Sequence, residues 1–383
     1  MVVTPKATSG FVDAHSHLRS TSLADQGVLG STRLEEALLR MTAMSSVAAA
    51  DDAFVAASDL VLAGVTGVQV IFHTFANRER YLETLAATCA GLEKSGIRAL
   101  VILAITDQAE WLPEKLSDAD LLPDWLPPSE NLSVVDLEWV YREAVKLFPK
   151  LAFGIGPVGA QWCSDAVLAA LGELAQEGMR IHTHLLESDW QRNWLAENPL
   201  LRLARHGLLS DKTSLAHGVW CDETELKLIA DHGAQLVTCP GSNGLLKSGS
   251  APIELWQKVG VKFGFGLDSA ADPPRPFEIA RTALSDTDAL RVLTEGGRSC
   301  TNLDTQADEV VWRDFAAGNC ERVTISGTTQ VEAGELVNYR EVDAARARVL
   351  EQMTADASAR SHRQSALTGL MPGYLGELEK CCG

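Results

Sequence analysis

The chain has 383 residues, of which 46% are apolar, and a formal net charge of −18. No apolar run reaches the roughly 18–20 residues that span a bilayer, and the start lacks the basic and then apolar regions of a signal peptide. We therefore expect a cytoplasmic protein that is not bound to membrane. The acidic balance argues against nucleic acid as a partner, because phosphate backbones bind positive surfaces. The eight cysteines form no Cys-x-x-Cys pair, so they indicate neither a zinc ribbon nor a disulfide scaffold.

The first chemical feature is a pair of histidines near the start of the chain. His15 and His17 follow a short apolar segment that is typical of a strand. Side chains two positions apart on a strand point to the same face, so these two imidazoles could form half of a metal site. Two histidines of the core or the surface, without a ligand role, would give the same pattern. The metal interpretation needs further ligands from later strands.

Along the chain, apolar segments rich in β-branched residues alternate with segments of helical periodicity. The expected strands lie near Val12 and at residues 65–73, 97–106, 151–156, 179–184, 213–217, 234–239 and 261–268. The expected helices are 32–50, 51–63, 77–95, 134–148, 164–177, 189–206, 222–232, 253–259 and 276–300, with a Trp-, Pro- and Asp-rich loop at 107–133. Eight such units predict an α/β fold, a (β/α)8 TIM barrel. No Gly-x-Gly-x-x-Gly follows the first strand, which argues against a dinucleotide-binding sheet.

The pattern changes near residue 309. Short antiparallel strands are expected at 309–313, 322–326 and 334–338, then a helix at 342–355 and a weakly periodic, loosely held tail at 366–383. We divide the chain into a barrel (1–308), a small β segment (309–341) and a C-terminal helix and tail (342–383). Two or three strands are marginal alone. The apolar surface of the β segment must therefore be covered by the barrel or by a second copy, and a homodimer is possible.

Polar residues gather where the expected barrel strands end, which is where barrels of this type carry their chemistry. These residues are His15, His17, His73, His182, His184, His217 and Asp268, with Glu187 shortly after the fifth strand. Several imidazoles and a carboxylate around an open position suit Zn²⁺ or Fe²⁺ in a catalytic site. His73, at the end of the second strand, could contact the substrate.

Five motifs together resemble the amidohydrolase superfamily, and within it the mononuclear deaminase and triazine-hydrolase-like group. They are Val-Asp-Ala-His-Ser-His-Leu (12–18), His-Thr-His-Leu-Leu-Glu (182–187), Leu-Ala-His-Gly-Val-Trp (215–220), Cys-Pro-Gly-Ser-Asn (239–243) and Gly-Leu-Asp-Ser (266–269). The resemblance implies that the metal ligands are His15, His17, His184 and Asp268. It also implies that Glu187 is the proton shuttle and that His217 holds the attacking water or the substrate. His182, one layer deeper in the barrel, is expected to support the site or contact the substrate rather than bind the metal.

The sequence departs from the family pattern in two places. Relatives usually carry a longer segment before the first strand, which pairs with the C-terminal strands in a small β-sandwich. About ten residues precede the first strand here, so we expect the N-terminal half to be absent and the sandwich to be reduced or missing. Relatives with two metals place a carbamylated lysine at the end of the fourth strand, whereas Lys150 stands at the other end of that strand. We therefore expect one divalent metal ion.

The resemblance implies a hydrolase acting on carbon–nitrogen bonds other than peptide bonds. Hydrolytic deamination of a small aminated N-heterocycle is the first hypothesis, with Glu187, His217 and Asp268 as catalytic residues. Trp162 could stack on a flat ring, or simply pack, and Arg275 could meet a carboxylate or carbonyl, or be an exposed loop residue. Release of chloride or an amine from a triazine-like ring, or cleavage of an amide, stays open. An inactive binding or assembly subunit is a third alternative.

Overall fold

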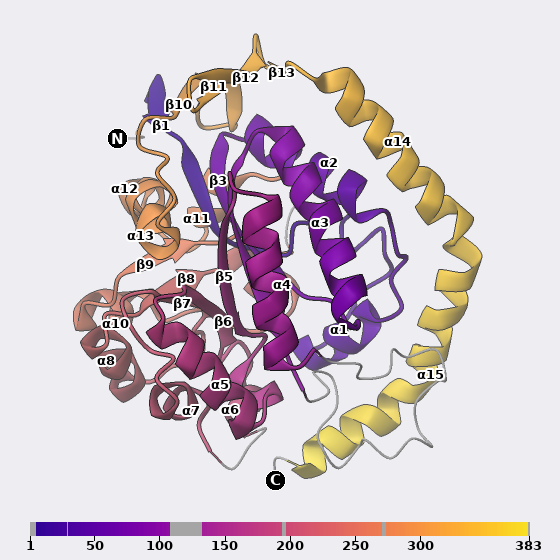
Figure 1. Cartoon of the computed structure of the whole chain (residues 1–383), viewed down its shortest axis with the longest axis vertical. Coiled ribbons are helices and arrows are strands. Elements are labelled where there is room, and N and C mark those ends of the chain that lie inside the picture. The colour runs from indigo at the N-terminus through magenta and orange to yellow at the C-terminus, as the bar shows by residue number, and fades with distance from the viewer. Residues whose placement is uncertain (1–4, 29, 108–131, 194–196, 270–272, 382–383) are drawn as a thin grey trace.

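The computed structural model describes residues 5–28, 30–107, 132–193, 197–269 and 273–381, so most of the expected loop at 107–133 lies outside it. Eight parallel strands are neighbours in chain order. They are β2 (Phe11–Ser16), β3 (Val65–Phe72), β4 (Arg98–Ile105), β5 (Ala152–Pro157), β6 (Ile181–Leu185), β7 (Thr213–His217), β8 (Gln235–Thr238) and β9 (Phe263–Phe265). The predicted barrel is confirmed (Figure 1).

Helices surround the strands, and local sequence explains several of their ends. For example, the Asn77 side chain accepts from the Arg80 N–H at the start of α3, and Gly96 ends that helix in the left-handed conformation. The helices before the second sheet are α1 (Leu34–Met41), α2 (Ala49–Leu62), α3 (Arg78–Ser95), α4 (Val134–Leu147), α5 (Asp165–Gln176), α6 (Asp189–Asn193), α7 (Pro199–Arg205), α8 (Glu223–Asp231), α9 (Pro240–Leu245), α10 (Ile253–Val259), α11 (Pro276–Ala280), α12 (Asp286–Arg291) and α13 (Gly297–Thr301).

Three of the expected helices are wrong in extent. The segment 32–50 holds only α1 and the start of α2. The segment 189–206 holds two helices, the second of which begins at Pro199, a residue that cannot supply the N–H that an interior helical position needs. The segment 276–300 is a series of short pieces that includes a π-helical turn at Val292–Gly296. Hydrophobic periodicity found these segments but did not locate their breaks.

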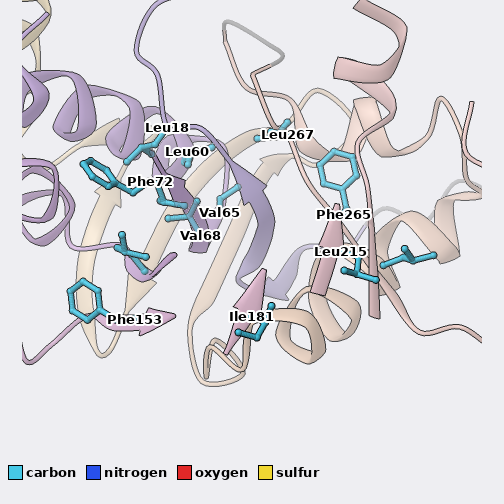
Figure 2. Close-up of a cluster of buried hydrophobic side chains, with 14 of the residues drawn as sticks. Leu18, Leu60, Val65, Val68, Phe72, Phe153, Ile181, Leu215, Phe265 and Leu267 are labelled. Carbon is cyan, nitrogen blue, oxygen red and sulfur yellow. The ribbon is translucent and has the colours of Figure 1, made fainter. Parts of the chain in front are cut away.

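The apolar core lies between the strands and the helices outside them. Leu18, Val65, Val68, Ile181, Leu215 and Phe265 are among its buried side chains (Figure 2). Every residue of β2, β3, β6, β7, β8 and β9 is buried, as expected for parallel strands that are covered on both faces. This continuous core holds the strand ends in fixed positions.

The seam between the last and first strands brings distant site residues together. The Asp268 N–H donates to the His15 carbonyl oxygen at 2.8 Å, and the His17 N–H donates to the Asp268 carbonyl oxygen at 3.2 Å. These bonds form an isolated parallel bridge between Ser16, at the end of β2, and Asp268, which follows β9. The carboxylate of Asp268 is thereby held beside the two histidines of the first strand.

A second, antiparallel sheet has the order β1 (Ala7–Ser9), β10 (Glu309–Asp314), β11 (Asn319–Ile325), β12 (Thr328–Glu332) and β13 (Glu335–Leu336). It has five strands, whereas two or three were expected. The short N-terminal segment adds β1 by pairing with β10, and β12 was not among the expected strands. The barrel covers its apolar face. The Trp312 ring lies 5.2 Å from the Phe11 ring and packs over Gly64, where a β-carbon would lie 2.5 Å from the indole.

The C-terminal segment contradicts the expectation of a loosely held tail. Helix α14 (Tyr339–Ala355) and helix α15 (Ala357–Cys381) run around the outside of the barrel (Figure 1). Leu367, Met371 and Tyr374 of α15 are buried against Leu39 and Ala43, in and just after α1. Among the described residues, no helix is long and apolar enough to cross a membrane.

Candidate active site

Five potential ligands come from four parts of the barrel and converge at its C-terminal end. The His17 Nε2 atom lies 3.3 Å from Asp268 Oδ1 and 3.3 Å from His184 Nε2. The His15 Nε2 atom lies 3.6 Å from the same Asp268 oxygen. His15 and His184 form a second close group with His217, within which the ligand atoms lie within 4.8 Å of one another. Imidazoles and a carboxylate at this spacing could hold a divalent metal ion.

Two ligand atoms of this cluster have no hydrogen-bond partner among the described residues. They are His15 Nε2 and His217 Nε2, both buried, which lie 3.6 Å from an Asp268 oxygen and 3.5 Å from a Glu187 oxygen, too far for a hydrogen bond. A buried polar atom without a partner is costly, so such atoms ordinarily indicate a ligand. The residues therefore fit a divalent cation. Nitrogen and carboxylate donors suit zinc or iron rather than magnesium or calcium.

The protein also fixes which imidazole nitrogen faces the cluster. The Nδ1 atom of His184 lies 2.7 Å from the Val158 carbonyl oxygen, and that of His217 lies 2.9 Å from Asn243 Oδ1. Because these oxygens only accept, Nδ1 carries the proton in both rings. Each Nε2 atom is therefore left with a lone pair that points into the cluster, as a metal ligand requires.

His182 supports His15 from below. Its Nε2 atom lies 2.8 Å from His15 Nδ1, and its Nδ1 atom lies 3.1 Å from the Ser214 carbonyl oxygen. The Ser214 carbonyl oxygen only accepts, whereas the Gln69 Nε2 atom, 2.9 Å from the same His182 Nδ1, only donates, so the two contacts favour opposite tautomers. In the tautomer with the proton on Nδ1, His182 Nε2 accepts from His15 Nδ1–H, which leaves His15 Nε2 free to bind a cation. Gln69 closes the network by donating to the Ala14 carbonyl oxygen at 2.7 Å.

Glu187 lies beside this cluster and is only 5% exposed. Its Oε2 atom is 3.5 Å from His217 Nε2, and its Oε1 atom accepts from the Ser248 hydroxyl at 3.2 Å. Burial, with the nearby charge of Asp268, raises the pKa of Glu187 well above its ordinary value. Burial opposes ionisation of Asp268 too, but His15 and His17 hold the pKa of that carboxyl well below its usual range. The two carboxyls are thus set for different roles, one to carry a proton and one to stay charged.

The backbone around the cluster is strained. Of the eight described residues other than glycine with positive φ angles, four lie here, namely Leu18 (48°), Leu186 (44°), His217 (73°) and Asp268 (58°). Each belongs to the cluster or adjoins one of its members. A conformation of this kind costs about 1–3 kcal/mol per residue and is common at functional sites, where the surrounding structure imposes it.

A cavity of about 500 Å³ opens from the cluster toward α1. Much of its wall is apolar and comes from Leu38, Met41, Met44, Phe75, Trp162 and Leu246. His17, His73, His184, Glu187 and Asp268 also line it. The His73 ring packs edge-on against Phe75 at 4.6 Å, and burial, followed by the charges of His184 and Arg19, lowers the pKa of His73 to about 3. A flat, mostly apolar ring would fit this wall.

The family model for the amidohydrolase family matches residues 7–326. This chain belongs to the amidohydrolase family. Among curated proteins it is 34% identical over 153 residues to a 5-methylthioadenosine/S-adenosylhomocysteine deaminase of Symbiobacterium thermophilum, with 38% of this chain and 35% of that protein covered. It is 28% identical over 205 residues to a guanine deaminase of Dictyostelium discoideum, with 47% and 46% covered. The matches thus span between a third and a half of those relatives.

Solved structures of similar fold cover more of the chain. An adenosine deaminase from Xanthomonas campestris with bound zinc superposes with a TM-score of 0.71 and 22% identity, over 91% of this chain and 86% of that one. An atrazine chlorohydrolase from Arthrobacter aurescens TC1, complexed with zinc, gives a TM-score of 0.70 and 19% identity, over 90% and 88%. At this identity the likeness establishes the barrel fold and not the substrate.

The structure of this amidohydrolase brings together most of the residues singled out in the sequence. His15, His17, His184, His217, Asp268 and Glu187 converge, and His73 and Trp162 line the cavity. Two residues lie elsewhere. His182 does not line the cavity, because its ring is turned beneath His15. Arg275 is exposed beside Glu278, at 3.2 Å, and lines a separate small hollow with Trp312. Of the two alternatives for Arg275, these contacts favour the exposed loop residue.

Several residues of the site were not found in the sequence. Gln69, Ser214, Ser242 and Ser248 donate to or orient site residues, and Ser242 hydrogen-bonds the Asp268 carboxylate. Nothing in their local sequence distinguishes them from other buried polar residues. Arg19, which lines the cavity, had an available signal, because it directly follows the first motif and stands two positions after His17.

Proposed function

We propose that this amidohydrolase catalyses the hydrolytic deamination of a small aminated N-heterocycle. The observation that carries the proposal is the placement of Glu187, a buried carboxyl of raised pKa next to the group of potential metal ligands. A general acid and base works best when its pKa lies near the working pH. The names of the curated relatives, which are deaminases, support the same reaction.

The metal ligands in this proposal are His15, His17, His184 and Asp268. One divalent ion, zinc by preference and iron as the alternative, would lower the pKa of a water molecule from 15.7 to about 7. A second ion would need a bridging ligand from β5, where Gly154 and Gly156 stand near the end of the strand. A β-carbon at Gly156 would lie 1.9 Å from the His182 carbonyl oxygen, so a side chain there is not tolerated. We therefore propose one ion per chain.

The protein's own groups would handle the protons. Glu187 would take one proton from the attacking water and deliver it to the leaving nitrogen, so that the ring carbon gains oxygen and ammonia departs. His217, whose proton is held on Nδ1 by Asn243, would accept a hydrogen bond from the water through Nε2 and so orient it. Asp268, kept ionised, would stabilise the positive charge that gathers around the reacting centre. The apolar cavity wall would hold the flat ring and exclude bulk water.

The direct test is product analysis with the zinc-loaded enzyme. A panel of aminated pyrimidines, purines and triazines, together with chlorinated triazines and cyclic amides, is incubated with the protein, and ammonia, chloride and ring-opened products are measured in parallel. The proposal predicts ammonia from at least one aminated ring, with no ammonia from the Glu187→Gln variant. If only chloride release or only amide cleavage is observed, the proposed deamination is wrong and the corresponding alternative reaction takes its place. No product from any compound would favour a binding subunit.

A further inference from the structure

Arg19 lies at the edge of the candidate active site. It stands two positions after His17, so its backbone is at most about 7 Å from that ligand. Its side chain is exposed, and it lines the same cavity as His17, His73, Glu187 and Asp268. Arg19 is the only lysine or arginine among the described residues that line this cavity.

Among the described residues the guanidinium of Arg19 forms no ion pair within 4 Å, although the charges of Asp52 and Asp268 act on it. Its one hydrogen bond within the described part of the chain is from Nη1 to the Met44 sulfur atom at 3.2 Å, and a thioether is a weak acceptor. The nearby carboxylate of Asp52 instead accepts from the Ser20 N–H at 2.8 Å and from the Ser20 hydroxyl at 2.5 Å. The fork of N–H donors on Arg19 is therefore available to a ligand in the cavity.

The charge around Arg19 limits what that ligand can be. Asp52 lines the cavity with it, and among the described lining residues no second lysine or arginine is present to bind a second negative charge on the ligand. A single carboxylate matches one guanidinium in charge, and its two oxygens match the planar donor fork. A phosphate, which carries more charge, fits less well.

We propose that Arg19 determines specificity by binding a carboxylate substituent on the substrate. The inference rests on the proposed function, since it assumes that the reacting carbon lies at the cluster formed by the potential metal ligands. The substrate class is then an aminated N-heterocycle with a carboxylate on the side of the ring that faces α1. In this proposal Arg19, which follows β2, binds the carboxylate that was considered as a partner for Arg275, which follows β9.

The test measures binding rather than turnover. Nicotinate and 3-acetylpyridine are N-heterocycles of nearly equal shape; the first carries a carboxylate, the second a neutral ketone, and neither has a bond that the proposed reaction would break. Isothermal titration of the zinc-loaded enzyme should give at least tenfold tighter binding of nicotinate. Arg19→Met should remove this preference, and Arg19→Lys, which keeps the charge but loses the fork, should retain part of it.

Arg275→Met is the matched control and should bind both compounds as the unmodified enzyme does. Arg19→Gln is a second variant, and the thermal unfolding midpoint of each variant checks that it is folded. Equal affinity for the two compounds, no binding of either, or a nicotinate preference that survives in Arg19→Met would overturn the inference. The last result would place the carboxylate on the metal centre. Release of chloride instead of ammonia would overturn the proposed reaction but leave the binding preference of Arg19 intact.

Discussion

The strand-end cluster and the C-terminal helices represent two ways in which a sequence builds structure. In the cluster, Asp268 is joined to His15 and His17 by backbone hydrogen bonds between strand ends, and each side chain has a fixed orientation. Helix α15 instead rests on apolar contacts of Leu367, Met371 and Tyr374 with α1. The site side chains are therefore positioned by the strands of a rigid barrel, whereas the outer helices are held by contacts between segments that are distant in the sequence.

The two regions nevertheless meet at α1. Its Leu38 and Met41 line the active-site cavity, while its Leu39 packs against α15. Glu35, also on α1, is buried and accepts a hydrogen bond from Ser188, the residue after Glu187. The outer helix therefore supports one wall of the cavity from behind. Four changes test the difference between the two regions.

The largest expected effect is at the cluster. Glu187→Gln keeps the shape of the side chain but cannot transfer a proton, so kcat should fall by about 10²–10⁴. Metal content should be unchanged, because Glu187 is not among the proposed ligands. Steady-state kinetics and elemental analysis of the same preparation check both statements. A variant with kcat within threefold of the unmodified enzyme would remove Glu187 from the mechanism.

A smaller effect is expected where α15 meets α1. Leu367 is fully buried, so Leu367→Ala should lower the free energy of unfolding of that contact by about 2–3 kcal/mol. Because α1 lines the cavity, KM should rise more than kcat falls. Denaturant unfolding and kinetics are the measurements, and Ser365→Ala, on the exposed side of the same helix, is the control. Equal behaviour of the two variants would show that the contact does not support the cavity.

A change at Asn243, which orients one imidazole, should reduce activity less than Glu187→Gln does. Asn243→Ala removes the acceptor of the His217 Nδ1 proton, which lies 2.9 Å away. Loss of such an orienting partner typically costs 10–100-fold in activity or metal affinity. We expect a loss of that size in kcat/KM with little change in global stability. A variant that is fully active would mean that His217 is held in place by packing alone.

The smallest effect is expected at the exposed ion pairs that join the C-terminal helices to the barrel. The Arg348 Nη2 atom lies 2.5 Å from Asp51 Oδ1, and about half of the Arg348 side chain is exposed. Exposed pairs of this kind contribute little, since water and salt screen them. Arg348→Ala should leave the unfolding midpoint and the activity within error. A loss of stability comparable to that of Leu367→Ala would mean that apolar contacts are not the main attachment of the C-terminal helices to the barrel.

The sequence predicted the barrel and the convergence of the cluster because both follow from local patterns. Strand periodicity placed β2, β6, β7 and β9, and the C-terminal ends of parallel strands meet at one rim. His182 was expected one layer deeper than His184, but its contact with His15 depends on the register between strands that are far apart in the sequence. Partners such as Gln69 and Ser248 could not be identified for the same reason.

The C-terminal segment was misjudged for a different reason. Leu367, Leu370, Met371 and Tyr374 do have helical spacing, but Gly369, Pro372, Gly373 and Gly376 lower the helix propensity of the same segment. Packing against α1 and Ala43 overrides that propensity in the folded protein. The N-terminal strand β1 is similar, since three residues form a strand only because β10 is there to pair with them.

The central claim is that one divalent ion is held by His15, His17, His184 and Asp268. Elemental analysis of the protein, expressed with zinc and then exhaustively dialysed, tests it most directly when the Asp268→Asn and Arg275→Met variants are measured alongside. We predict one ion per chain in the unmodified protein and in Arg275→Met, and a large loss in Asp268→Asn. Two ions per chain, no ion in any sample, or full retention in Asp268→Asn would contradict this account.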